Sequence, residues 1–141
     1  MKIFSLEIIS PEGSIYKDIV SEVILPTTTG EIAVLPGHAP LFTKLSDGEI
    51  LVKKEKQSIS IAISGGFLEI SENKVNVLAN YAVRSEEIEM QKIAEAKAKA
   101  EEALKQTKDK EGLIAAEKDL KKYAMELKIA ERLKKRRKKN I

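Results

Sequence analysis

The chain has 141 residues, of which 43% are hydrophobic, 33% charged and 4% aromatic, with no cysteine, no tryptophan and one histidine. This length fits one domain, or a small domain with an appended element, and excludes a large multidomain enzyme. The lack of cysteine excludes disulfide scaffolds, thiolate zinc sites, iron–sulfur clusters and thiol catalysis. No apolar run approaches the roughly 18 residues of a membrane-spanning helix, and residues 1–7 are a poor secretory signal, so we expect contact with a membrane only through a partner.

The net charge of +3 is divided unevenly along the chain. Residues 1–84 hold 8 Lys or Arg against 10 Asp or Glu, whereas residues 85–141 hold 17 against 12. Seven of the eight residues at 132–139 are basic. Such a terminus fits an acidic protein surface or a nucleic acid, or it is simply solvated. The scattered aromatic residues argue against a surface that stacks bases.

Short runs in the first half alternate β-branched or aliphatic residues with polar ones, which is the pattern of half-buried strands. We expect strands, in chain order, over residues 2–9, 19–25, 31–35, 41–45, 49–53, 59–63, 67–70 and 75–78. The Asp47-Gly48 pair predicts a tight hairpin between the fourth and fifth of them. Because no helical pattern lies between the strands, they predict an antiparallel sandwich or barrel.

From Ser85 onward strong helix formers dominate, which predicts a helix with Ser85 as its N-cap and a break over residues 107–112. A second helix from residue 113 has apolar residues spaced 3, 4, 3, 4, 3, namely Leu113, Ala116, Leu120, Tyr123, Leu127 and Ala130. The matching strip on the first helix is Ile93, Ala96, Ala100 and Ala103. The sequence therefore predicts an α+β fold, with an antiparallel β sandwich over residues 1–84 and an antiparallel helical hairpin with a basic tail over residues 85–141.

The hairpin seam is rich in alanine and so buries little apolar area. Replacing a buried leucine with alanine costs about 2 to 5 kcal/mol, and this seam lacks much of that stabilisation from the start. Both a folded hairpin and an extended arrangement of its helices are compatible with the pattern. Extended as one helix, residues 113–139 would reach roughly 40 Å.

The chain offers no catalytic constellation. It has no phosphate-binding loop, no dinucleotide fingerprint and no HExxH zinc motif. The single histidine, His38, lies in a Pro- and Gly-containing turn without an identifiable nucleophile or orienting acid. We expect no catalytic residue, no metal and no cofactor.

Several segments together resemble the epsilon subunit of the bacterial F-type ATP synthase, and the resemblance covers essentially the whole chain. Gly30-Glu31 is followed by VLPGHAPL at residues 34–41, and SGGFLE at residues 64–69 is followed by VNVLA at 75–79. The resemblance implies a noncatalytic rotor subunit of the central stalk, which binds the gamma subunit and the ring of c subunits during ion-driven ATP synthesis. It implies a peripheral position at the cytoplasmic face of the cell membrane.

The resemblance also implies site residues. Gly30 and Glu31 would face the polar loops of the c ring, and Gly37 and His38 would lie in the same stalk contact region. The helical hairpin would extend along gamma into the alpha/beta catalytic head and inhibit ATP hydrolysis. Basic residues of the second helix would then meet an acidic loop of beta, and the candidates are Lys121, Lys122, Lys128, Arg132, Lys134, Lys135 and Arg136, with the run continuing to Lys139.

Some members of that family bind ATP through a motif that is degenerate here. The matching stretch begins at Ile88, but Glu89 replaces aspartate, Lys92 replaces arginine and Ile93 replaces alanine. On the second helix, Lys122 and Glu126 stand where nucleotide-binding members have arginines. Lysine lacks the planar fork that grips phosphate, and a glutamate repels it, so we expect weak or no ATP binding by the isolated subunit.

An alternative from another class is a free-standing interaction module whose basic helix binds nucleic acid. Copurification separates the two interpretations, because the first predicts gamma and c-ring partners and the second predicts nucleic acid.

Overall fold

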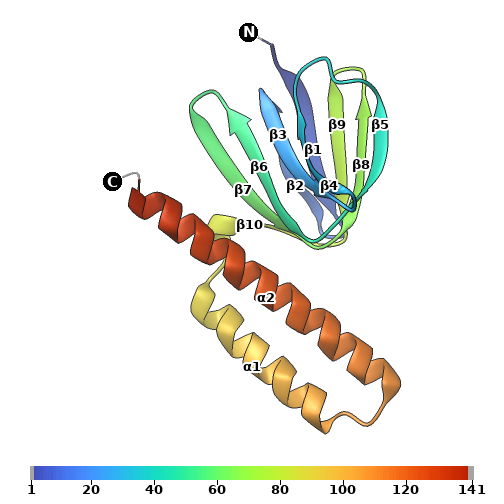
Figure 1. Ribbon diagram of the computed structural model, residues 1–141, viewed down its shortest axis with the longest axis vertical. Coiled ribbons are helices and arrows are strands. Elements are labelled where there is room, and N and C mark those ends of the chain that lie inside the picture. Colours follow the sequence, from blue (N-terminus) through green and yellow to red (C-terminus); the bar gives the residue numbers. More distant parts are fainter. Residues whose placement is uncertain (1, 140–141) are drawn as a thin grey trace. The chain divides into compact units, whose positions relative to one another are not determined.

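The computed structural model describes the backbone of residues 2–139 and the side chains of residues 2–135. It divides into two compact units, residues 1–84 and residues 85–141. The first unit holds all ten strands and the second holds both α-helices, so the predicted α+β fold is confirmed (Figure 1). None of the helices in the described part of the chain is both long and apolar enough to cross a bilayer.

The first unit is a ten-stranded sheet that curls over its own core. Its strands are β1 (Phe4–Ser10), β2 (Gly13–Val20), β3 (Glu22–Thr27), β4 (Gly30–Val34), β5 (Leu41–Leu45), β6 (Gly48–Lys54), β7 (Gln57–Ile63), β8 (Gly66–Ser71), β9 (Lys74–Ala79) and β10 (Ala82–Arg84). Neighbours follow the order β10-β7-β6-β3-β5-β8-β9-β1-β2, and β4 pairs with β3. The pairs are antiparallel apart from β1 and β9, which run parallel.

Two strands depart from the sequence prediction. The predicted strand at residues 19–25 runs across Ser21, where β2 ends and β3 begins. Most of β2 was not predicted, because this strand lies at the end of the sheet order and buries only Tyr16 and Val20, which leaves little alternation to detect. The three residues of β10 are too few to show any period.

The Asp47-Gly48 hairpin prediction is wrong. β5 pairs with β8 and with the end of β3, whereas β6 pairs with β7 and with the start of β3, so the two strands beside Asp47-Gly48 are not partners. Gly48 does not have the positive φ of a tight hairpin turn. Its place is instead explained by packing, since a Cβ there would lie 3.1 Å from the Pro26 side chain. Long-range pairing therefore overrides the local turn signal.

The core of this unit comes from alternate residues of the strands. β1 alternates buried with half-buried residues and β8 alternates buried with exposed ones, as a two-faced sheet requires. The largest fully buried apolar side chains are Leu6, Ile8, Leu25, Leu45, Ile50, Ile61, Ile63 and Leu68. Their burial supplies the main stabilisation of the sandwich.

Tyr16 is a polar exception in this core. Its side chain is 5% exposed, its hydroxyl has no hydrogen-bond partner among the described residues, and the Arg84 guanidinium lies 5.4 Å from its ring centroid. Burial, followed by the charge of Asp18, raises the pKa of the Tyr16 hydroxyl. A raised pKa in the folded state means that the contribution to stability is present below about pH 10 and is lost as the pH rises through the folded pKa.

We therefore expect Tyr16→Phe to leave the free energy of unfolding unchanged or to raise it by about 1 kcal/mol, because the change removes a buried hydroxyl without a partner. Phenylalanine keeps the ring beneath Arg84, whereas Tyr16→Leu removes it and should be destabilising. Urea unfolding at neutral pH and above pH 10 measures both effects, and the alkaline loss should shrink in Tyr16→Phe. A cost of more than about 1 kcal/mol for Tyr16→Phe at neutral pH would contradict this assignment.

The second unit consists of a short 3₁₀ turn (Ser85–Glu87), α1 (Met90–Gln106) and α2 (Lys110–Lys139). The two helices run antiparallel (Figure 1). The N-cap of α1 is Glu89, not Ser85, which is buried in the 3₁₀ turn. Gly112 lies inside α2 and not in the connection, because α2 begins at Lys110, before the predicted start.

The alanine seam is shorter than the sequence indicates. Ala100 and Ala116 are buried, at 8% and 6% exposure, but Ala103 and Leu113 are exposed. In an antiparallel hairpin whose connection centres on residue 108, residues 100 and 116 stand level with each other. Small residues at that level let the two helices approach closely.

Candidate docking surface

Large apolar side chains occupy solvent positions on the strands β5, β8, β9 and β1. Phe42 is 65% exposed, Phe67 44% and Leu78 52%. The inward positions of the same strands are already filled by core residues such as Leu68 and Val77, so these three side chains are not needed by the fold. Clustered apolar side chains of this kind mark a surface that binds another molecule.

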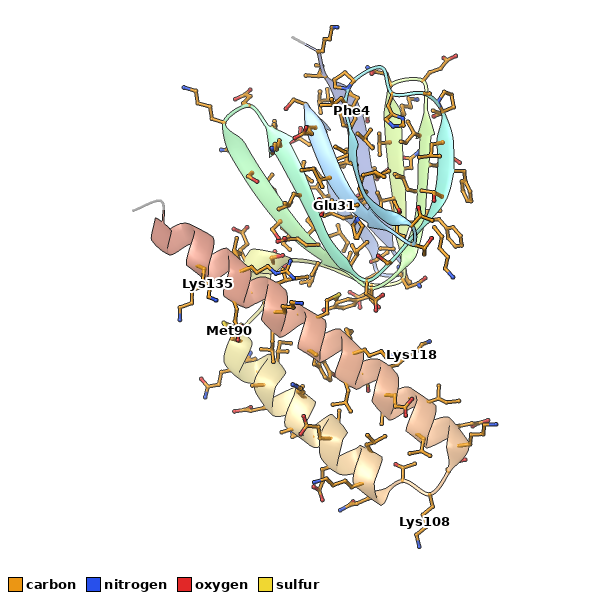
Figure 2. All side chains as sticks on the ribbon, in the orientation of Figure 1. Phe4, Glu31, Met90, Lys108, Lys118 and Lys135 are labelled. Atoms are coloured by element: carbon orange, nitrogen blue, oxygen red, sulfur yellow. The ribbon has the colours of Figure 1, made fainter. Side chains whose placement is uncertain are left out.

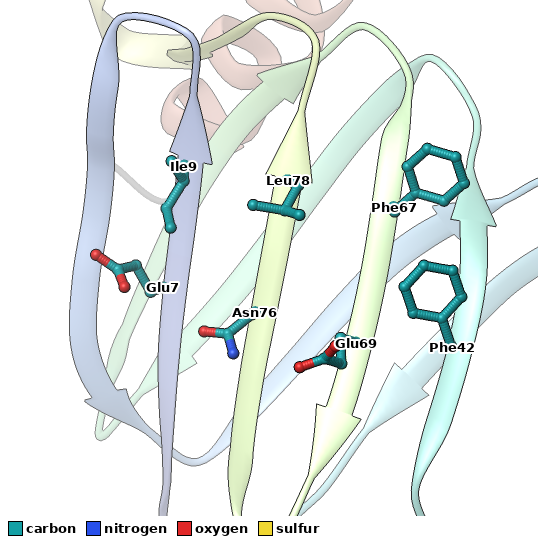
Figure 3. A pocket seen from close by; sticks show the side chains of 7 residues that line it. All are labelled: Glu7, Ile9, Phe42, Phe67, Glu69, Asn76 and Leu78. Atoms are coloured by element: carbon teal, nitrogen blue, oxygen red, sulfur yellow. The ribbon is translucent and has the colours of Figure 1, made fainter.

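Strand register gathers these residues into rows (Figure 3). Phe67 on β8 is opposite Leu78 on β9, and Leu78 is level with Ile9 on β1, which makes an apolar row. Phe42 on β5 is opposite Glu69 in register, but its ring stacks on that of Phe67, with centroids 5.6 Å apart and 18° between the planes, and so adds to the apolar row. Two residues away along the same strands, Glu69, Asn76 and Glu7 are likewise aligned, and we call them the acidic row.

Both rows line one shallow hollow of about 320 Å³. We call it the outer face, defined by Glu7, Ile9, Phe42, Phe67, Glu69, Asn76 and Leu78. The sequence prediction missed the outer face. A signal was present, because Phe67-Leu68 and Val77-Leu78 are consecutive apolar residues, and one residue of each pair must face away from the core. Only the register shows that the two outward residues, Phe67 and Leu78, lie opposite each other.

The residues expected to meet the c ring lie at the two ends of β4. Gly30 begins this strand with φ +127°, and Glu31 follows it with an exposed side chain. Gly37, with φ +81°, and His38 lie in the turn beyond Val34, where His38 Nδ1 is 2.7 Å from the Ala39 carbonyl. Since residues 30 and 34 are roughly 13 Å apart along a strand, the structure does not bring the two pairs into one cluster.

The basic residues of α2 separate by their helical position. Lys121, Lys128, Arg132 and Lys135 are exposed and share one face of the helix, because they follow at intervals of seven, four and three residues. We call them the basic stripe, which spans roughly 21 Å. Lys122 and Lys134 point elsewhere, and Lys122 Nζ lies 5.1 Å from the Tyr123 ring centroid. Lys135, the last residue of the basic stripe, is labelled in Figure 2. The side chain of Arg136 lies outside the described residues.

The degenerate nucleotide motif lies at the start of α1. Lys92 Nζ is 3.2 Å from the carboxylate of Glu89, so its two charged residues pair with each other on the surface. Ile88 is half-buried, and Glu126 on α2 is 1% exposed. Among the described residues no group of three or more His, Cys, Asp or Glu side chains is placed to hold a metal ion.

Comparison with known proteins assigns the chain to a family. Residues 3–85 match the family model of the ATP synthase delta/epsilon chain β-sandwich domain. Over 137 residues the chain is 42% identical to the ATP synthase epsilon chain of Endomicrobium trichonymphae, covering 97% of this chain and 99% of that one. It is also 42% identical to the epsilon chain of Caldanaerobacter subterraneus over 92% of this chain and 94% of that one.

A solved structure agrees with these relatives. A chain in the Euglena gracilis mitochondrial ATP synthase, seen with OSCP, F1 and the c ring, has a TM-score of 0.72 and 27% identity, covering 88% of this chain and 79% of that chain. The fold and the family match therefore define a delta/epsilon-type sandwich subunit with an appended helical hairpin. The chain belongs to the ATP synthase epsilon chain family, whose members are central-stalk subunits. These relatives give no support to the nucleic-acid alternative.

Proposed function

We propose that this subunit fastens gamma to the c-subunit ring during ion-driven ATP synthesis, catalyses nothing itself, and inhibits ATP hydrolysis through its helices. It is peripheral, at the cytoplasmic face of the cell membrane, and meets the membrane only through these partners. The observation that carries the proposal is the exposed apolar row of the outer face in a chain of the epsilon family.

Gamma is the proposed occupant of the outer face. Phe42, Phe67 and Leu78 are each about half exposed or more, and aromatic and aliphatic anchors buried at the centre of an interface dominate binding energy. The c ring then takes a separate surface at the start of β4, through Gly30 and Glu31, while Gly37 and His38 beyond the end of β4 make a second contact with the c ring or gamma. Separate surfaces let one small sandwich hold two partners at once.

The helical unit is the part of the chain that we propose inhibits ATP hydrolysis. The basic stripe presents four positive charges along one exposed helix face, which is complementary to an acidic loop of beta in the alpha/beta head. Lys122, Lys134 and Arg136 are the remaining basic candidates on this helix. Contacts between exposed charges are screened by salt, so the inhibition should weaken as ionic strength rises.

The test is ATP hydrolysis by the matching catalytic head after removal of its own epsilon subunit. We expect the full chain to slow hydrolysis and residues 1–86 to bind gamma without slowing it, because the truncated form keeps the sandwich and loses both α-helices. As a matched control, the full chain with Lys121, Lys128, Arg132 and Lys135 changed to Gln should bind gamma normally and inhibit weakly. If neither form bound gamma, the proposed coupling role would be wrong. If both forms bound gamma and neither inhibited hydrolysis, the proposed inhibitory role of the helices would be wrong.

A further inference from the structure

The outer face has an acidic row directly beside its apolar row, which an apolar docking site does not require (Figure 3). Glu69 is opposite Asn76 on β9, and Asn76 is level with Glu7 on β1. Three adjacent strands therefore place the two carboxylates on either side of one amide, roughly 10 Å apart at their Cα atoms. The arrangement is set by the sheet and does not depend on a flexible loop.

The carboxylates of this row have little to neutralise them. The described residues form no ion pair with Glu69 or Glu7, and Glu7 accepts one hydrogen bond, from the Ser14 hydroxyl at 3.0 Å. Three lysines lie near the row: Lys17 on β2 is opposite Glu7, Lys44 on β5 is opposite Phe67, and Lys74 on β9 is two residues from Asn76 on the same face. None of the three forms an ion pair with Glu69 or Glu7. Both acids are therefore available to a partner.

Docking of an apolar partner on the adjacent row removes water from these carboxylates. A desolvated carboxylate without a counter-charge is costly, so a partner that offers only apolar residues would be penalised here. A guanidinium or ammonium group over Asn76 would instead meet both acids, and an arginine has enough donors for two carboxylates and the amide oxygen. The row therefore selects between partners of similar apolar shape.

We propose that the partner segment seated on the outer face carries an arginine or lysine that lies between Glu69 and Glu7, about 7 Å from the residue that packs on Phe67 and Leu78. This spacing equals two residues of an extended strand, and in a helix the nearest spacing is four residues, about 6 Å. The inference rests on the proposed function, in which that segment belongs to gamma, and it adds the chemistry by which gamma is recognised.

Binding of purified gamma to the full chain, measured at low and at high salt, tests the proposal. Glu69→Gln and Glu7→Gln keep the side-chain shape and remove the charge. We expect each to weaken binding at low salt by about tenfold or more and to reduce the dependence of the affinity on salt. Glu55→Gln, in the turn between β6 and β7 and away from the outer face, is the matched control and should bind as the wild type does.

Phe67→Ala separates this inference from the proposed function. If Phe67→Ala weakens binding while both Glu→Gln variants keep the affinity and salt dependence of the wild type, the basic partner residue is refuted and gamma docking stands. If Phe67→Ala also binds gamma normally, the outer face is not the gamma site and both ideas fail. Self-association of the full chain that Phe67→Ala abolishes would assign the face to a second copy and overturn the proposal. Unchanged melting temperatures confirm that the variants are folded.

Discussion

Gly66→Ala is expected to unfold the sandwich or to destabilise it by more than about 3 kcal/mol, a large part of the 5 to 15 kcal/mol that holds a typical domain together. A Cβ at residue 66 would lie 2.1 Å from the Leu78 carbonyl oxygen and 2.8 Å from the Ala79 Cα. Both atoms belong to the backbone of the paired strand β9, so no side-chain rotation relieves the contact. Gly66 also has φ +139°, which L side chains rarely adopt.

Gly37→Ala is the matched control for the backbone angle alone. Gly37 has φ +81°, but a Cβ there would meet nothing within 4 Å. We expect a cost of about 1 to 2 kcal/mol from the left-handed conformation, and a fall in melting temperature of about 4 to 8 °C per kcal/mol. Thermal unfolding of the two full-length variants makes the comparison, and similar melting temperatures would show that β8 and β9 separate easily. Because Phe67 and Leu78 lie beside the clash at residue 66, we expect Gly66→Ala to weaken gamma binding as well as stability.

Ala100→Leu is expected to strengthen inhibition of ATP hydrolysis markedly. Ala100 is 8% exposed and level with the buried Ala116, so a larger side chain overpacks the hairpin at a cost of typically 1 to 3 kcal/mol. If the extended arrangement escapes that cost, the equilibrium shifts toward it by roughly 5- to 150-fold. The measurement is the concentration of the full chain that halves hydrolysis by the head stripped of its own epsilon.

Ala103→Leu is the control, because the structure overturns its predicted place in the seam. Ala103 is exposed, so leucine there meets no helix and should leave inhibition as it is in the wild type. Helix content by circular dichroism should be equal in the two variants. If Ala100→Leu inhibits hydrolysis no more than the wild type does, loosening the hairpin does not increase inhibition, and this prediction is wrong.

The sequence predicted those strands whose alternation is strong. The range 41–45 coincides with β5, and the predicted strands at 67–70 and 75–78 lie within β8 and β9 with one residue missing at each end. Alternation reports which residues of one strand face the core, and it needs no knowledge of the neighbouring strand. Alternation does not identify which strand pairs with which, and for this reason Asp47-Gly48 was wrongly predicted to form a hairpin.

The candidate site was less predictable for the same reason. Phe67 and Leu78 are eleven positions apart in sequence and become neighbours only through the β8–β9 register. Glu7 reaches the same face through a parallel pairing, which no local turn announces. The basic stripe could be predicted more closely, because a helix fixes the direction of each residue from its own spacing.

The parallel pairing of β1 with β9 also determines when the chain can finish folding. Ser5 pairs with Lys74 and Ile9 with Leu78, so partners lie 69 residues apart in sequence. Contacts at such separation form late, because a long loop must close before they contribute. During synthesis the free edge of β1 therefore stays open until residues 74–79 have left the ribosome. Because those residues supply Asn76 and Leu78 to the outer face, a stalk partner that recognises this face can assemble only after β9 has been translated.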